Sequence, residues 1–98
     1  MESVYEEALC YEFTLRGINF EQQIYVDVPY KDYIIRGKQR LDLLVEREVI
    51  VELKSVRQLP EKATAITLSY LRATKLKRAL LINFGERLLK NGIKRLSL

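Results

Sequence analysis

The hydrophobic positions of the first sixteen residues recur with the period of a helix. Ala, Leu and Glu are plentiful from Glu2 to about Arg16, and Gly17 stands where a helix C-terminal cap is expected. At about 100° per residue, one arc collects the apolar side chains of Val4, Tyr5, Ala8, Leu9, Tyr11 and Leu15. Glu12 falls in the middle of this arc and Glu2 near its edge. Because a buried carboxylate needs a partner, we expect these two to meet a metal, a cation or a hydrogen-bond donor.

The pattern then changes to the two-residue period of strands. Ile18 to Pro29 has apolar residues at mostly even positions, and β-branched residues dominate it. Two further strands are expected over Tyr30–Ile35 and Arg40–Val45, separated by a turn at Arg36–Gln39. Val49 to Val56 is a fourth strand-like run.

The second half alternates helix and strand. Pro60 suits the first turn of a helix that runs to about Lys75. Leu76–Phe84 contains an unbroken apolar run and is expected to be a strand covered on both faces. Glu86–Leu98 is expected to form a short helix that stops near Asn91, and then a last strand. The order of helix, three or four strands, helix and strand predicts an α/β (α+β) fold, a mixed sheet flanked by helices.

Length and composition limit the classes of function. The chain has 98 residues, enough for a single domain over 1–98, and 48% hydrophobic with 31% charged residues are typical of a globular protein. No apolar run approaches the roughly 20 residues that span a bilayer, and the N-terminus has no export signal, so we expect a cytoplasmic protein without membrane contact. Cys10 is the only cysteine and there is no histidine. Chemistry must therefore use carboxylates, lysine, tyrosine or an oxygen-ligated metal.

Basic residues gather in the C-terminal third. Residues 1–68 carry 9 Lys or Arg against 12 Asp or Glu, whereas residues 69–98 carry eight basic residues against Glu86 alone. Such a surface could bind the phosphates of a nucleic acid, or it could be a solvated face that keeps the protein soluble. The residues expected to contact nucleic acid are Arg72, Lys75, Lys77, Arg78, Lys94 and Arg95.

Two carboxylates are expected to meet across a hairpin. If the chain turns around Arg47, residues whose numbers sum to 94 face each other, and Asp42 lies opposite Glu52. Lys54 shares a side of its strand with Glu52. Two like charges at this distance need a cation between them, and hard oxygen ligands favour Mg²⁺ or Mn²⁺. The alternative is a surface ladder of salt bridges with no catalytic role.

The segment from Asp42 to Lys54 resembles the motif of the PD-(D/E)xK nuclease superfamily, and the whole chain resembles its GxxExxY branch. The segments that carry this second resemblance are Glu2–Tyr5, Glu7–Leu9, Glu12, Leu15–Ile18, Gln22–Gln23, Pro29–Lys31, Asp42–Val45, Val51–Lys54, Leu68–Leu71, Leu80–Gly85 and Leu89–Arg95. The glycine of the branch motif and the helix before it are expected to be missing. That absence would leave apolar surface for a partner or for a second copy in a homodimer.

The resemblance implies a restriction-endonuclease-like αβββαβ core and a metal-dependent nuclease that hydrolyses phosphodiester bonds in DNA. Asp42 and Glu52 would bind the metal, Lys54 would be the catalytic lysine, and Glu2, with Glu12 as a second candidate, would support the metal site. Tyr70 matches a tyrosine near the substrate phosphate, but Ile66 stands where the superfamily's glutamine is expected. A weakened or inactive nuclease is therefore one expectation. The alternative is a non-catalytic module that binds nucleic acid or protein.

Overall fold

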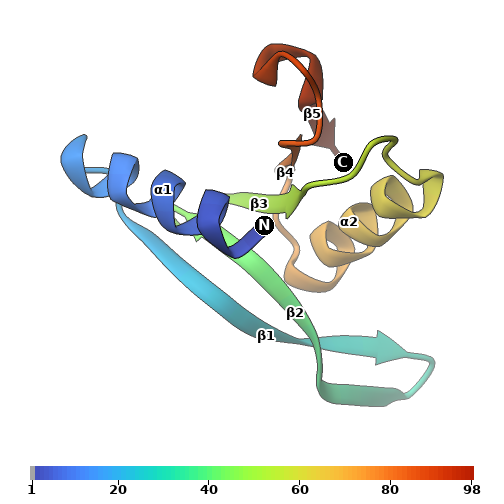
Figure 1. Cartoon of the computed structure of the whole chain (residues 1–98). Coiled ribbons are helices and arrows are strands. Elements are labelled where there is room, and N and C mark those ends of the chain that lie inside the picture. Colours follow the sequence, from blue (N-terminus) through green and yellow to red (C-terminus); the bar gives the residue numbers. More distant parts are fainter. Residues whose placement is uncertain (1) are drawn as a thin grey trace.

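The computed structural model describes residues 2–98 and contains one five-stranded sheet with two α-helices. In chain order the elements are α1 (Glu2–Leu15), β1 (Phe20–Tyr30), β2 (Tyr33–Val45), β3 (Val49–Lys54), α2 (Glu61–Thr74), β4 (Arg78–Asn83), the 3₁₀ turn η1 (Leu89–Gly92) and β5 (Ile93–Ser97). The sheet order is β1-β2-β3-β4-β5, and only β3 and β4 run parallel, joined through α2 (Figure 1). The expected mixed sheet flanked by helices is confirmed.

The two helices pack against opposite faces of the central strand β3. On one face Val51 and Leu53 pack with Cys10 of α1, and on the other Ile50 packs with Leu71 of α2. These five side chains are all buried, so β3 is covered on both faces. Figure 1 shows β3 between α1 and α2. No helix within residues 2–98 is both long and apolar enough to cross a membrane.

The buried face of α1 differs from the expected arc. Tyr5, Leu9 and Phe13 turn toward the sheet, whereas Val4, Ala8, Tyr11 and Leu15 are exposed. Glu12 is also exposed, and its carboxylate pairs with the Arg16 guanidinium at 3.4 Å, so the expectation that it lies on a buried stripe is wrong. The arc of apolar residues was broad enough to include two faces, and the aromatic residues Tyr5 and Phe13 decided which one is buried.

β1 and β2 form one long hairpin, and its turn lies elsewhere than expected. The chain turns at Lys31 and Asp32, and β2 continues through residues 36–39, which were expected to be a turn. These residues include a bulge instead, because Val26 pairs with Gln39 but Val28 already pairs with Ile35. Gly37 has a φ of 63°, a conformation that bulges and turns both require of glycine. The glycine at position 37 therefore does mark an irregular backbone, but the irregularity is a bulge within β2 and not a turn between two strands.

A second irregularity lies next to the predicted carboxylate on β2. The β1–β2 ladder pairs Gln22 with Leu43 and Ile24 with Leu41 but leaves out Gln23, which has a φ of 52°, and Asp42. Leu41 consequently packs on the α2 side and Leu43 on the α1 side, although strict alternation predicts the same side for both. The gap in the ladder at Gln23 and Asp42 therefore coincides with the point where the side chains of β2 exchange faces of the sheet.

Candidate functional site

Asp42 and Glu52 lie side by side where the β2–β3 ladder ends. The ladder pairs Leu43 with Val51 and Val45 with Val49, which is the register expected for a turn around Arg47. Beyond it the carboxylates replace the ladder bonds. The Asp42 N–H donates to Glu52 Oε2 at 3.0 Å, and the Leu53 N–H donates to Asp42 Oδ2 at 2.8 Å. Each carboxylate is therefore held by the backbone of the opposite strand.

Burial and the neighbouring charge keep Glu52 neutral in the absence of a cation. Its side chain is on the α2 side of the sheet, and the residue is only 7% exposed. Burial, followed by the hydrogen bond and the negative charge of Asp42, raises the pKa of Glu52 from 4.5 to about 9. Lys54 acts in the opposite direction but is outweighed. Without a bound cation the pair of carboxyl groups therefore carries one negative charge, and ionisation of both groups requires a cation.

These carboxylates line a pocket of about 190 Å³ between the sheet and α2. Its walls are formed by Glu2, Arg40, Asp42, Glu52, Leu53, Lys54, Ala63, Ile66, Thr67 and Tyr70. Burial, then the charges of Glu52 and Asp42, raise the pKa of Tyr70, so its hydroxyl remains protonated and can donate a hydrogen bond. The structure therefore gathers all five predicted site residues around one pocket.

The other residues predicted for the site differ in how they contribute to the pocket. Glu2 lines the pocket from the first turn of α1, but within residues 2–98 no three Asp, Glu, Cys or His side chains come together as a metal cluster. Ile66 occupies the α2 wall and is 43% exposed, so an apolar side chain faces the opening where the superfamily's glutamine was expected. Glu12 has no part in the pocket.

Asn83, at the end of β4, holds the loop that follows Lys54. It was not identified as a site residue from the sequence. It is 2% exposed, its Oδ1 accepts from the Val56 N–H, and its Nδ2 donates to the Val56 carbonyl, both at 3.0 Å. The next residue, Phe84, donates its N–H to the Lys54 carbonyl at 2.8 Å. These bonds fix the chain directly after Lys54. In the sequence, Asn83 could have been identified as the single polar residue at the end of the apolar run of β4.

An aromatic stack ties α1 to this support. The rings of Tyr5 and Phe84 are parallel within 1° and their centroids are 4.5 Å apart. The next residue after Tyr5, Glu6, accepts hydrogen bonds from the Gln22 and Gln23 side chains of β1, each at 2.9 Å. The first turn of α1, which carries Glu2, is thereby fixed near the pocket.

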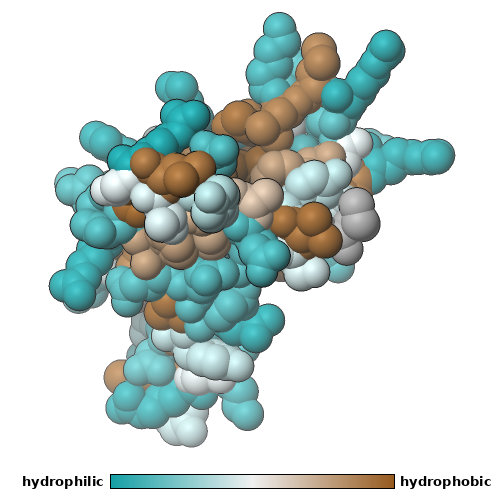
Figure 2. All heavy atoms as spheres, turned by 60° about the vertical axis from the view of Figure 1, so that its left-hand side comes forward, coloured by the Kyte–Doolittle hydropathy of each residue, from teal (hydrophilic) through white to brown (hydrophobic). Residues whose placement is uncertain are grey.

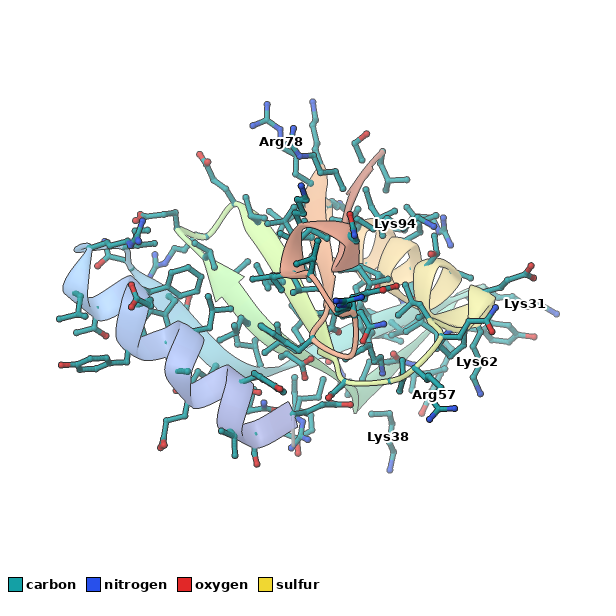
Figure 3. The ribbon with its side chains drawn as sticks, turned by 45° about the horizontal axis from the view of Figure 1, so that its top comes forward. Lys31, Lys38, Arg57, Lys62, Arg78 and Lys94 are labelled. Atoms are coloured by element: carbon teal, nitrogen blue, oxygen red, sulfur yellow. The ribbon has the colours of Figure 1, made fainter. Side chains whose placement is uncertain are left out.

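The basic residues of the C-terminal third lie at different distances from the pocket. The Lys94 ammonium donates to Thr64 Oγ1 at 3.0 Å, close to the pocket wall on α2. Arg78, in contrast, pairs with Val49 at the start of β3, five residues before Lys54 and hence about 17 Å away. Figure 3 shows Arg78 far from Lys38, Arg57 and Lys62. Lys77 precedes Arg78, so it lies at the same remote end.

Comparison with known proteins identifies the family. A family model described as the PD-(D/E)XK nuclease superfamily matches residues 1–96. The chain belongs to this superfamily. PD-(D/E)XK nucleases generally use divalent metals such as Mg²⁺ or Mn²⁺. No curated protein matches the chain.

Two solved structures share the fold. The crystal structure of SSO0001 has a TM-score of 0.73 and 14% identity, and the match covers 97% of this chain and 48% of that one. An alkaline exonuclease (LHK-Exo) from Laribacter hongkongensis has a TM-score of 0.64 and 12% identity, with 97% and 55% covered. This PD-(D/E)XK chain therefore spans about half the length of the two structures.

The donor set of the pocket fits the metal that the superfamily uses. Mg²⁺ is usually bound by one or two carboxylates together with water and substrate phosphate, so a cluster of three acidic side chains is not required. Asp42 and Glu52 provide two adjacent carboxylates, and burial together with the neighbouring Asp42 raises the pKa of Glu52, so a cation bound between them would favour its ionised form. Oxygen ligands without histidine match Mg²⁺ or Mn²⁺ better than Zn²⁺.

Proposed function

We propose that this chain is a metal-dependent nuclease of the GxxExxY branch that hydrolyses phosphodiester bonds in DNA. The observation that carries the proposal is the pair of carboxylates, Asp42 and Glu52, beside Lys54 in one pocket. Both would hold Mg²⁺ or Mn²⁺, and Glu2 would support them from α1. When bound, the metal would polarise a phosphate oxygen and lower the pKa of the attacking water.

The chain's own residues prepare the site for this chemistry. The Leu53 and Asp42 amides fix both carboxylates before substrate arrives, so little reorganisation is needed. Glu52 has to release its proton when the site is loaded, because its pKa of about 9 keeps it protonated at neutral pH. The loop held by Asn83 fixes the backbone of Lys54.

Lys54 and Tyr70 are the groups that would meet the phosphate. The ammonium of Lys54 can stabilise negative charge that develops on the phosphate or orient the attacking water. The protonated hydroxyl of Tyr70 can donate to a phosphate oxygen from the α2 wall. Arg40 lies two residues before Asp42 on β2. It also lines this pocket and adds a positive charge to it.

Cleavage of labelled DNA in Mg²⁺ or Mn²⁺ tests the proposal. Asp42→Asn and Lys54→Ala should each reduce the rate by at least about 100-fold. Asn is preferred to Ala at position 42, since its side-chain oxygen can still accept the Leu53 N–H. Glu48→Gln, an exposed change on the β2–β3 turn outside this pocket, is the control and should cleave normally. Wild-type rates in both site variants would refute the assignment.

The second candidate is a module that binds nucleic acid without cleaving it. The observations that favour it are the apolar Ile66 on the pocket wall and the failure of Glu2 to complete a three-residue cluster. It predicts salt-sensitive DNA binding and no metal-dependent cleavage by the wild-type protein. Turnover that disappears in Lys54→Ala would exclude it.

A further inference from the structure

The outer half of the β1–β2 hairpin forms an arm that extends beyond the body of the protein. Figure 1 shows it reaching past α2, and Figure 2 shows it as the narrow lower part of the molecule. No residue between 27 and 40 belongs to either hydrophobic core cluster. The arm is held instead by its own strand pairing and by the ion pair of Arg36 with Asp27 at 3.2 Å. The side chains of the arm therefore do not contribute to the hydrophobic core, and packing of the core does not explain their identities.

Large aromatic side chains are nevertheless concentrated at the tip of this arm. Tyr30 and Tyr33 face each other directly across the turn, and they are 59% and 67% exposed. The Lys31 ammonium lies 5.5 Å from the centroid of the Tyr30 ring. Exposed rings next to cations are the combination that proteins use to stack bases and neutralise phosphates.

A hollow lies on the arm beside the bulge around Gly37. The hollow measures about 490 Å³ and is lined by Asp32, Tyr33, Ile34, Ile35, Arg36 and Lys38. The hollow is open to solvent, and its volume, within the range of small-ligand sites at about 300–1,000 Å³, is enough for one unpaired nucleotide. Tyr33 offers an aromatic face to a base, and Lys38 offers an ammonium to its phosphate.

Charge decides between nucleic acid and a second copy of the chain. Residues 27–40 carry four cations and two carboxylates, a net charge of +2. Two such arms would repel each other, whereas a polyanion is attracted. The same strand also leads to the pocket, because Lys38, Arg40 and Asp42 follow one another at every second position of β2 and Arg40 lines the pocket with Asp42.

We infer that the arm binds single-stranded nucleic acid, with an unpaired base on Tyr33 and a phosphate near Lys38, and that β2 guides this strand toward the pocket. The inference rests on the proposed function for its class of polymer. It assigns to the arm a set of phosphate contacts along β2 that is separate from those of Lys54 and Tyr70 in the pocket. It also names the substrate form, a strand with unpaired bases.

Fluorescence anisotropy with labelled dT20, in EDTA so that no cleavage occurs, tests the arm in the full chain. Tyr33→Leu should weaken binding by about 5- to 100-fold, the effect of losing one base stack. Tyr33→Phe should bind like the wild type because it keeps the ring. Lys38→Ala should lower the slope of log Kd against log salt by about 0.7. A fully paired 20-base-pair duplex should bind more weakly than dT20.

The controls separate this inference from the proposed nuclease activity. Tyr11→Leu removes an equally exposed tyrosine, 63% accessible on α1, and should not affect dT20 binding. Lys54→Ala should abolish cleavage, and in that background Tyr33→Leu should still weaken dT20 binding by the same factor as in the wild type, so each hypothesis can fail alone. Unchanged binding in both Tyr33→Leu and Lys38→Ala would overturn the inference. So would tighter binding of the duplex, or a dimer in light scattering that Tyr33→Leu dissociates.

Discussion

Replacing Glu52 by Gln should make the metal-free protein more stable at alkaline pH. The amide of Gln mimics the protonated carboxyl, since it can accept from the Asp42 N–H and donate to the Asp42 carboxylate. The wild type behaves differently because its Glu52 has a pKa of about 9 in the folded state and an ordinary value of 4.5. Neutral Glu52 therefore stabilises the fold fully below pH 4.5, and this contribution is lost as the pH rises toward 9.

The magnitude follows from the pKa difference. Each pH unit between the two pKa values lowers the free energy of unfolding by about 1.4 kcal/mol. From pH 5 to 8 the wild type should lose up to about 4 kcal/mol relative to Glu52→Gln, a large part of the stability of a small domain, about 5–15 kcal/mol. Excess Mg²⁺ at pH 8 should stabilise the wild type by mass action and leave Glu52→Gln nearly unchanged.

Urea unfolding in EDTA at several pH values measures this difference. Other titrating groups are common to both proteins, so subtracting the two free energies of unfolding isolates Glu52. Glu48→Gln, an exposed change on the β2–β3 turn, is the matched control, and its stability should follow the pH profile of the wild type. Parallel pH profiles for the wild type and Glu52→Gln would refute the argument that Glu52 is buried neutral.

Three further outcomes are expected. Calorimetry of Mn²⁺ binding at pH 7.5, in buffers of different ionisation enthalpy, should show release of about one proton per metal from Glu52, and no release would contradict its raised pKa. Gly85→Ala should destabilise the fold by about 1–3 kcal/mol in urea, because a β-carbon there would collide with the Val56 carbonyl; an unchanged midpoint would disprove this close approach. Tyr70→Phe should keep the stability and slow cleavage by at least about tenfold at unchanged pH, while an unaffected rate would remove Tyr70 from the site.

The carboxylate pair was the part of the site that the sequence predicted best. Antiparallel pairing has a fixed two-residue period, so one assumption about the turn at Arg47 placed Asp42 beside Glu52. The two backbone hydrogen bonds that hold them could not be predicted, because they depend on the ladder opening at this pair. Asn83 was missed for a related reason, since its partners lie on a loop 27 residues away.

Errors elsewhere have identifiable physical causes. The apolar residues of α1 cover more than one face, and packing with the sheet selects Tyr5 and Phe13 over Val4 and Tyr11. A glycine at positive φ serves bulges and turns equally, so Gly37 alone could not distinguish them. The charge excess of the C-terminal third was correct as a sum, but sequence position did not reveal that parallel pairing of β3 and β4 puts Arg78 far from Lys54.

The hydrogen bonds of Asp42 and Glu52 affect how variation in this family should be interpreted. Both carboxylates accept backbone donors that would otherwise be left unpaired, so a member that no longer cleaves would still gain stability from a side-chain oxygen at each position, whether acid or amide. Within residues 2–98 the ammonium of Lys54 has no hydrogen bond or ion pair. Its loss would cost the fold little. Among homologues, lysine at this position should therefore distinguish active from inactive members better than the presence of a side-chain oxygen at positions 42 and 52.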